Sequence, residues 1–360
     1  MSVYMAEALR LAALAIGRTS PNPLVGAVVV RDDKIIGRGY HQKAGTPHAE
    51  IHALAEAGKA ARGATVYVTL EPCSHHGRTP PCSDALIKAE VNKVVIAMRD
   101  PNPLVAGEGI AQLQRAGIVV EVGDQAPEAA RLNEVFLKYI ATKLPFVTFK
   151  TAMSLDGKIA TAGGESRWIT GSETRQWVHR LRDCYDAILV GSGTVLADNP
   201  ELTARIPNGR NPIRLVVDSR LRIPLSAKLL SGAQTTPVII ATTHLAPQAK
   251  IAALQALGVQ IMRYESAQVP LPQFFRDLGQ IEITSILCEG GSTLAAALFT
   301  QALIDKVHFC IAPKIIGGDA APGPIGGNGI AVLKDALQLH ELDVQHHGSD
   351  LILTGYPVHA

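Results

Sequence analysis

The sequence has little cysteine, almost no excess charge and no long hydrophobic run, and each shortage excludes a class of protein. Five cysteines in 360 residues are too few for a disulfide scaffold, and their odd number favours reduced thiols in the cytoplasm. The longest uncharged run, residues 229–249, contains Pro237, Pro247 and several polar residues, so it does not predict a membrane span. We therefore expect a cytoplasmic protein without membrane contact.

The charge balance bears on nucleic-acid binding. The chain has 34 Lys and Arg against 32 Asp and Glu, a net charge of +2, and residues 1–145 carry 16 basic against 14 acidic side chains. Binding to a phosphate backbone usually requires a basic excess on one face or domain. We therefore expect no nucleic-acid partner.

Length and composition indicate two folded domains. Apolar residues make up 47% of the chain and charged residues 18%, which is a globular composition, and 360 residues are about twice a typical domain. The stretch Ala141–Pro145 is the candidate boundary, because a new series of strands begins at Phe146. We expect one domain over residues 1–145 and another over residues 146–360.

Hydrophobic periodicity predicts an α/β first domain. Helices are expected over residues 3–17, 47–58, 81–90 and 128–140, with a further short one before residue 118. Strands are expected over residues 25–31, 35–40, 64–70, 93–98 and 118–122. This alternation predicts a partly parallel sheet covered by helices on both faces.

The second domain is also predicted to be α/β. Helices are expected between most of its strands, which are predicted over residues 146–152, 187–190, 213–217, 237–241, 284–287, 306–312 and 351–354. Residues 316–330 contain six glycines and two prolines and are predicted to form a loop.

A group of metal-binding side chains is the sharpest signal in the first domain. His48-Ala49-Glu50 is followed by Glu71-Pro72-Cys73 and, nine residues after Cys73, by Cys82. One imidazole and two thiolates form a ligand set suited to zinc that leaves a fourth position for water, as in catalytic sites. Pro47 and Pro81 predict that one helix starts beside His48 and another beside Cys82. The positive end of a helix at its N-terminus favours thiolates over thiols.

Glu50 is positioned to move protons rather than to bind the metal. It lies two residues beyond His48, within reach of a metal-bound water. Together with the cysteines it forms the pattern of the zinc nucleobase deaminases, which replace an amino group on a ring by oxygen and release ammonia. The spacing departs from the usual one, because eight residues, 74–81, separate Cys73 from Cys82.

The second domain contains glycine-rich junctions between predicted strands and helices. Gly191-Ser192-Gly193-Thr194 and Glu289-Gly290-Gly291-Ser292-Thr293 each follow a strand. Glycines at such junctions allow backbone amides to approach a phosphate, with the positive end of a helix behind them. Each motif is weak alone, since the first lacks the third glycine of a dinucleotide-binding fingerprint and Gly290-Gly291 is equally compatible with a simple tight turn.

The motifs of the first domain resemble those of the bifunctional riboflavin-biosynthesis deaminase–reductases. The resemblance rests on residues 19–27 (TSPNPLVGA), 46–50 (TPHAE) and 71–82 (EPCSHHGRTPPC), whose long loop between the cysteines is characteristic of that family. It implies a cytidine-deaminase-like domain of αβα layers with a mixed sheet, with Glu50 as proton donor and a zinc site formed by His48, Cys73 and Cys82. It further implies that the pyrimidine and its phosphorylated ribose are held by Asn22, His41, His75 and Arg78.

The resemblance extends to the second domain, where it implies a dihydrofolate-reductase-like α/β fold that uses NADPH. At positions that contact the cofactor in that family, this chain has Ala152, Trp168, Thr194, Asp198, Gly291, Ser292 and Thr293. At substrate positions it has Lys150, Ser166, Arg182, Leu202, Arg205 and Glu289. Arg182 and Arg205 have the chemistry of a phosphate clamp. Lys150 and Asp198 are candidates for the acid of the hydride step, with neither preferred.

These observations predict an enzyme with two activities on phosphorylated pyrimidines. The first domain would deaminate 2,5-diamino-6-ribosylamino-4(3H)-pyrimidinone 5′-phosphate, and the second would reduce the opened ribose of the product with NADPH. The resemblance also implies a homo-oligomer, a dimer or a tetramer. Zinc and NADPH are the expected cofactors.

Three other functions are alternatives to this one. A nucleic-acid-editing deaminase would need a basic groove, which the charge balance does not favour. A single-function reductase with a purely structural zinc site would have no use for Glu50. A pyrimidine-binding regulator would leave the open coordination position unexplained.

Overall fold

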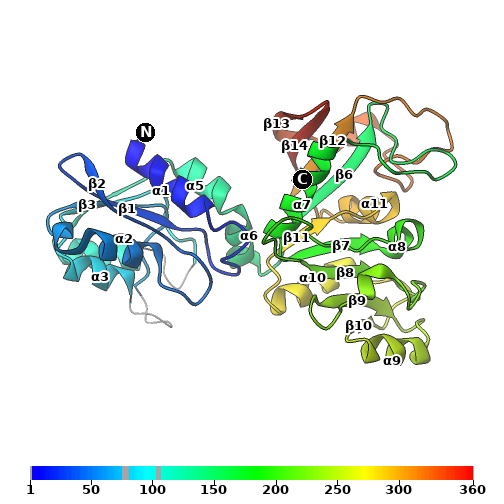
Figure 1. The fold of residues 1–360 in the computed structure, drawn as a ribbon, viewed down its shortest axis with the longest axis horizontal. Coiled ribbons are helices and arrows are strands. Elements are labelled where there is room, and N and C mark those ends of the chain that lie inside the picture. Colours follow the sequence, from blue (N-terminus) through cyan, green and yellow to red (C-terminus); the bar gives the residue numbers. More distant parts are fainter. Residues whose placement is uncertain (1, 75–80, 103–106, 360) are drawn as a thin grey trace. The chain divides into compact units, whose positions relative to one another are not determined.

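The fold was analysed in a computed structural model that describes residues 2–74, 81–102 and 107–359. The chain divides into two compact units, which we call unit 1 (Met1–Lys143) and unit 2 (Leu144–Ala360). Figure 1 shows unit 1 in blue to green and unit 2 in green to red. Over the described ranges, no helix has the length and apolar character that crossing a bilayer requires.

Unit 1 alternates helices and strands. Its helices are α1 (Val3–Ala13), α2 (Ala49–Ala57), the 3₁₀ helix η1 (Gly58–Ala61), α3 (Cys82–Lys88), α4 (Glu108–Arg115), α5 (Ala126–Leu132) and α6 (Glu134–Thr142). Its strands are β1 (Gly26–Arg31), β2 (Lys34–Tyr40), β3 (Thr65–Val68), β4 (Lys93–Ile96) and β5 (Val119–Val122). The sheet order is β2-β1-β3-β4-β5, with β1 antiparallel to both neighbours and β3, β4 and β5 parallel.

Helices cover both faces of this sheet because apolar side chains alternate along the strands. In β1, Ala27 and Val29 pack in one apolar cluster with helices α2, α3 and α4, whereas Val28 and Val30 pack in another with α1 and α5. Figure 1 shows α2 and α3 on one side of the strands and α1 and α5 on the other. The predicted αβα layers with a mixed sheet are confirmed.

Two glycines let helix α2 lie unusually close to strand β2. A Cβ atom on Gly37 would come within 2.2 Å of the Ala53 carbonyl oxygen, and one on Gly39 within 2.2 Å of the Ala49 carbonyl oxygen. The helix contributes small side chains to the same contact, among them Ala49, Ala53 and Ala57. The start of α2 is thereby fixed against the sheet.

Unit 2 is built on a larger sheet. Its strands are β6 (Phe146–Ser154), β7 (Ala187–Gly191), β8 (Ile213–Val217), β9 (Val238–Thr243), β10 (Gln260–Tyr264), β11 (Ser285–Cys288), β12 (Lys306–Ala312), β13 (Leu339–His347) and β14 (Asp350–Pro357). Its helices are α7 (Ser172–Cys184), α8 (Ser192–Asp198), η2 (Lys228–Leu230), α9 (Gln248–Ala256), α10 (Leu271–Gln280), α11 (Ser292–Thr300) and η3 (Leu333–Asp335).

The strand order in unit 2 is β10-β9-β8-β7-β11-β6-β12-β14-β13. The strands from β10 to β12 are parallel, and β14 and β13 add an antiparallel end. Alternate residues of β7 again point to opposite faces: Ala187 and Leu189 join the cluster with α10 and α11, whereas Ile188 and Val190 join the one with α8 and α9. Parallel pairing brings the carboxyl ends of β6, β7 and β11 to one edge.

The structure departs from the sequence-based boundaries in a few places. The predicted helix over residues 128–140 is two helices, because the buried Asn133 at their junction binds the backbone of Leu24, accepting its N–H at 2.8 Å and donating to its carbonyl at 3.0 Å. Helix α1 ends at Ala13 rather than at residue 17. Strands β10 and β13, both at sheet edges, were not anticipated.

We predict that Gly39→Ala destabilises unit 1 alone. The added methyl would overlap the backbone of α2, and overpacking of this kind costs about 1–3 kcal/mol. Both tryptophans, Trp168 and Trp177, belong to unit 2, so tryptophan fluorescence reports the urea unfolding of unit 2 and should be unchanged. The unfolding transition of unit 1, followed by circular dichroism, should move to a lower urea concentration. Gly163→Ala, whose nearest contact would be an ordinary 3.8 Å, is the control.

Candidate active sites

Three side chains of unit 1 form a metal-ligand set at one edge of the sheet. His48 is the N-cap of α2, Cys73 follows β3, and Cys82 is the first residue of α3. The helices begin at Ala49 and Cys82, slightly later than predicted from Pro47 and Pro81. The backbone holds the two cysteine segments together, because Ser83 donates its N–H (3.2 Å) and its hydroxyl (3.0 Å) to the Cys73 carbonyl.

The spacing of these ligand atoms fits zinc. His48 Nδ1 lies 3.2 Å from Cys82 Sγ and 3.5 Å from Cys73 Sγ, and all three atoms lie within 4.8 Å of one another. A tetrahedral zinc with Zn–S of about 2.3 Å and Zn–N of about 2.0 Å separates N and S ligands by about 3.5 Å. One nitrogen and two sulfurs leave one coordination position open.

The two thiols differ in acidity because they share a hydrogen bond. That bond from the Cys82 thiol lowers the pKa of Cys73, whereas the pKa of Cys82 is raised by the same bond and by burial. The backbone N–H of Cys82, at the start of α3, also donates to Cys73 Sγ at 3.3 Å. The lowered pKa of Cys73 favours its thiolate, the form in which cysteine binds zinc.

Glu50 lies in the first turn of α2, buried beside the ligand set. Its exposed fraction is 3%, it interacts with the Cys82 thiol, and its Oε2 atom has no hydrogen-bond partner among the described residues. Burial raises the pKa of Glu50 to about 7. A buried carboxyl oxygen without a partner is costly unless a ligand completes it.

Two of the predicted pocket residues lie beside the metal ligands. Asn22 Nδ2 donates to His41 Nε2 at 3.1 Å, and His41 Nδ1 donates to the Pro47 carbonyl at 3.3 Å. The His41 ring meets the His48 ring edge-on, with centroids 5.3 Å apart, and burial lowers the pKa of His41. The neutral His41 thus links Asn22 to the ligand set. The other two predicted residues, His75 and Arg78, lie outside the described residues.

Glu71, part of the sequence motif but not assigned a role from it, has a structural one. Its carboxylate accepts the backbone N–H groups of Asp100 (3.3 Å), Gly107 (3.1 Å) and Ile110 (3.3 Å). Glu71 therefore fixes the start of α4 beside the strand end that leads to Cys73. The side chain is buried, and the negative charge suits a helix N-terminus.

A buried cluster of charges marks the corresponding edge of unit 2. Glu289, directly after β11, binds Arg182 of α7 through two contacts of 2.7 and 3.0 Å. Its Oε2 also lies 2.8 Å from Nζ of Lys150 in β6. The exposed fractions of the three side chains are only 9% to 12%. Although burial opposes ionisation, Arg182 and Lys150 hold the pKa of Glu289 well below its usual range.

The glycine-rich junction after β11 forms the start of helix α11. Gly291 is the N-cap, and its backbone N–H donates to Thr194 Oγ1 at 3.1 Å, so Thr194 fixes this turn instead of leaving that N–H for a ligand. Ser292 and Thr293 occupy the first turn of the helix, where backbone N–H groups have no partners within the helix. A phosphate of a dinucleotide cofactor fits such a turn.

The remaining predicted residues of unit 2 are only partly brought together. Ser166 donates to Asp198 Oδ1 at 3.1 Å. Ala152 lies in β6, two residues beyond Lys150, and Trp168 is 60% exposed with the Arg175 guanidinium 4.7 Å above its ring. The side chain of Leu202 packs in the apolar cluster of α8 and α9, and the residue is buried.

His179 was missed by the sequence-based assignment. It lies on α7, three residues before Arg182, and contacts both Thr203 and Arg205. The signal that could have revealed it is the spacing, since residues three apart lie on one face of a helix.

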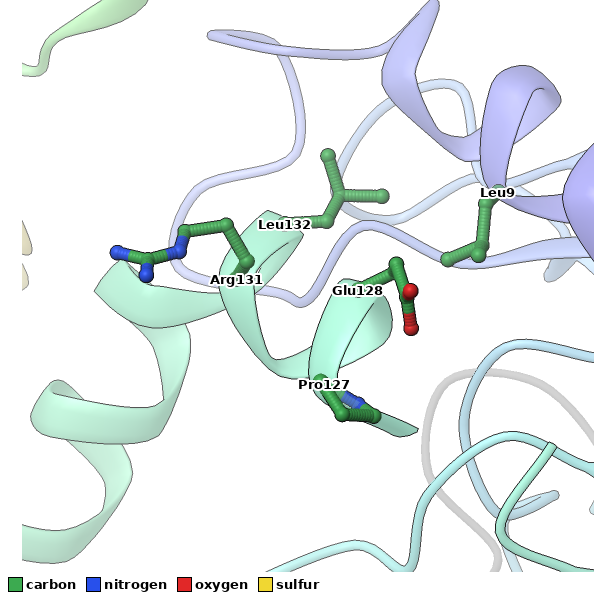
Figure 2. A pocket seen from close by; sticks show the side chains of 5 residues that line it. All are labelled: Leu9, Pro127, Glu128, Arg131 and Leu132. Atoms are coloured by element: carbon green, nitrogen blue, oxygen red, sulfur yellow. The ribbon is translucent and has the colours of Figure 1, made fainter. Parts of the chain in front are cut away.

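One further hollow of about 510 Å³ lies between α1 and α5 (Figure 2). It contains none of the predicted site residues and is lined by Leu9, Pro127, Glu128, Arg131 and Leu132. We assign it no role.

The folds and sites define a class of protein. A histidine and two cysteines with an open position, beside a buried glutamate, form the site of a zinc-dependent deaminase. Unit 2 adds an α/β domain whose polar cluster lies at the carboxyl ends of parallel strands, where such sheets bind nucleotides. The chain is therefore a deaminase joined to a nucleotide-using domain.

Comparison with known proteins specifies the family. The sequence model of the "Cytidine and deoxycytidylate deaminase zinc-binding region" matches residues 1–98, and that of the "RibD C-terminal domain" matches residues 145–353. The chain is 46% identical to the riboflavin biosynthesis protein RibD of Actinobacillus pleuropneumoniae, over 97% of this chain and 93% of that one. It is 44% identical to RibD of Escherichia coli, over 97% of both chains.

Solved structures agree with the sequence comparison. RibD of Acinetobacter baumannii superposes with a TM-score of 0.89 at 42% identity, covering 99% of this chain and 98% of that one. A Thermotoga maritima diaminohydroxyphosphoribosylaminopyrimidine deaminase/5-amino-6-(5-phosphoribosylamino)uracil reductase gives a TM-score of 0.87 at 37% identity, with the same coverage. The chain belongs to the RibD family. It is a two-domain enzyme, deaminase and reductase, whose cofactors are zinc and NADPH.

We predict that zinc content depends on Cys82 and not on thiols outside the ligand set. Cys82→Ser replaces a sulfur ligand by a hydroxyl, which zinc prefers much less, and metal measured by atomic emission should fall from about one to near zero per chain. Cys184→Ser in unit 2 should keep the metal. Equal zinc in both variants would exclude this ligand set.

We also predict that the Glu289 carboxylate stabilises unit 2. Glu289→Gln leaves two buried cations, Lys150 and Arg182, unpaired. Unfolding followed by tryptophan fluorescence at pH 7 should show that the free energy of unfolding falls by about 3–5 kcal/mol. Because the folded pKa is lowered, the stabilisation exists above the ordinary glutamate pKa of about 4.3 and is lost as the pH falls below it.

The difference between wild type and Glu289→Gln should therefore shrink by about 1.4 kcal/mol per pH unit below pH 4.3. The exposed Glu282→Gln is the control and should follow wild type. A difference that stayed constant down to pH 3 would contradict the lowered pKa.

Proposed function

We propose that this enzyme performs two consecutive steps on one phosphorylated pyrimidine. Unit 1 deaminates 2,5-diamino-6-ribosylamino-4(3H)-pyrimidinone 5′-phosphate, and unit 2 reduces the resulting 5-amino-6-(5-phosphoribosylamino)uracil with NADPH. The observation that carries the proposal is the buried carboxyl of Glu50, whose Oε2 has no hydrogen-bond partner in the described parts of the chain, beside an open three-ligand zinc site. The substrates are those named for the Thermotoga maritima relative.

In the deaminase site, His48, Cys73 and Cys82 hold the metal. Zinc supplies Lewis acidity, which makes water a better nucleophile near neutral pH. Glu50 takes the proton from the attacking water and delivers it to the departing amino group. Asn22, held by the neutral His41, presents its amide to the edge of the pyrimidine ring, and His75 and Arg78 are proposed to complete the pocket.

In the reductase site, the proposed substrate contacts are Lys150, Ser166, Arg182, Leu202, Arg205 and Glu289. NADPH supplies the hydride that reduces C1′ of the opened ribose. Lys150 Nζ is held 2.8 Å from Glu289 Oε2, and a lysine side chain so placed is suited to donate a proton or a hydrogen bond to a sugar oxygen. The proposed cofactor contacts are Ala152, Trp168, Thr194, Asp198, Gly291, Ser292 and Thr293.

We assign the deaminase to residues 1–145 and the reductase to residues 146–360. Support comes from the division of the structure after Lys143 and from the matched ranges of the two sequence models. We further propose a cytoplasmic location, which suits a chain of 360 residues with only five cysteines, an odd number.

We also propose a homo-oligomer formed through unit 2. In the described structure, β13 is an edge strand that exposes Leu342 by 59% and Val344 by 54%, a surface typical of strands that a partner covers. Sedimentation of the full chain as a monomer at micromolar concentration would contradict this.

We predict that Glu50→Gln stops deamination and leaves reduction intact. The amide cannot relay the proton, so ammonia release should fall by about 100-fold to 10,000-fold. NADPH oxidation with supplied 5-amino-6-(5-phosphoribosylamino)uracil should stay within twofold of wild type. Both reactions are followed on the full chain with zinc content measured in parallel.

Glu56→Gln, on an exposed position of the same helix, is the matched control and should keep both activities. A parallel loss of both activities with the fold intact would contradict the assignment of one activity to each unit. Wild-type protein that releases no ammonia from the diaminopyrimidine would refute the proposed substrate.

A further inference from the structure

His179 is a residue of unit 2 to which the proposed mechanism gives no role. It lies on α7 three residues before Arg182, so both side chains leave the same face of the helix. Its Nδ1 atom lies 3.2 Å from the Thr203 carbonyl oxygen, and its Nε2 atom lies 3.3 Å from Nη2 of Arg205. The imidazole therefore connects α7 to the segment after α8.

These contacts select one state of the imidazole. A carbonyl can only accept and a guanidinium can only donate, so both contacts require a neutral ring with its proton on Nδ1. The alternative tautomer would satisfy only the Arg205 backbone N–H, 3.3 Å from Nδ1. Burial, followed by the charges of Arg182 and Arg205, lowers the pKa of His179, which favours the neutral ring.

The segment held by His179 carries two proposed substrate contacts, Leu202 and Arg205. Arg182 Nη1 donates to the same Thr203 carbonyl at 3.2 Å, so two side chains of α7 fix this segment at one atom. The side chain of Leu202 is buried and its backbone has a positive φ of 58°, a conformation that such anchoring maintains.

The two arginines of the predicted clamp are not equivalent. Arg182 is 12% exposed and engaged by Glu289, whereas Arg205 is 52% exposed, with a surface ion pair to Glu201 at 3.1 Å. Only Arg205 can turn most of its donors to a ligand without breaking a buried pair. A long, exposed side chain gains affinity for phosphate when its orientation is fixed beforehand.

We propose that His179 is a positioning residue for the substrate phosphate of the reductase. Its Nε2 atom orients the Arg205 guanidinium. Its Nδ1–H donates to the Thr203 carbonyl and so fixes the backbone two residues before Arg205. This inference rests on the proposed reductase function and adds a residue that acts through Arg205 rather than on the substrate.

Two variants separate the two contacts of His179. His179→Asn retains a short donor near the Thr203 carbonyl and loses the acceptor at Nε2, whereas His179→Gln places an acceptor near the Nε2 position. NADPH oxidation by the full chain is measured against supplied 5-amino-6-(5-phosphoribosylamino)uracil. We expect H179N to raise KM about fivefold to tenfold with kcat within twofold, and H179Q to restore KM to within twofold of wild type.

Phosphate dependence distinguishes positioning from a general loss of structure. With the same uracil lacking its phosphate, H179N and wild type should have equal KM values. In an Arg205→Ala background, H179N should add no further increase in KM, because the residue it positions is absent. The exposed Gln176→Asn, on the same helix, is the control and should leave both constants unchanged.

Binding of ribose 5-phosphate, measured by calorimetry on the full chain, gives a readout that does not need turnover. We expect R205A to weaken the binding of ribose 5-phosphate. We expect H179N to weaken the same Arg205-dependent binding fivefold to tenfold. The inference is overturned if H179N binds and reacts as wild type, if its KM rises equally without the phosphate, or if R205A binds ribose 5-phosphate as wild type does. Wild-type protein that binds the phosphate but oxidises no NADPH would refute the proposed reductase function instead.

Discussion

Strand pairing brings the ends of neighbouring strands, and the segments that follow them, to one edge of a sheet, and both sites of this chain depend on that constraint. The pairing is antiparallel between β1 and its neighbours in unit 1 and parallel between β6 and β11 in unit 2. In unit 1 the register of β1 with β2 and β3 places the start of β1 beside the ends of its two neighbours. Asn22, His41 and Cys73 therefore come from three separate segments to the same edge. In unit 2, Lys150 and Glu289 meet in the same way across β6 and β11.

The close approach of helix and sheet turns this common edge into a metal site. Gly37 and Gly39 allow α2 to lie against β2, and the helix then delivers His48 at its N-cap and Glu50 in its first turn. Burial in this contact leaves a Glu50 oxygen without a hydrogen-bond partner among residues 2–74, 81–102 and 107–359. The same packing that stabilises unit 1 thus supplies the polar group that the proposed deamination needs.

Electrostatics organises the second site differently. Glu289 is shared between Lys150 and Arg182, so one buried carboxylate holds two cations from separate elements. Because Arg182 is engaged there, the exposed Arg205 is the arginine with donors available to a phosphate. The two arginines form one phosphate clamp in the sequence-based prediction, but in the structure Arg182 is buried against Glu289 and Arg205 is exposed.

The sequence by itself determined the α/β class, most strands and the deaminase motif, because hydrophobic periodicity and the spacing of His48, Glu50, Cys73 and Cys82 are local features. It also carried the family resemblance. Only the tertiary structure decided that Asn133 divides one predicted helix, since its partner Leu24 is distant in sequence. The contacts of His179 with Thr203 and Arg205 likewise join elements that sequence spacing leaves unrelated, because they depend on how α7 packs beside the segment after α8.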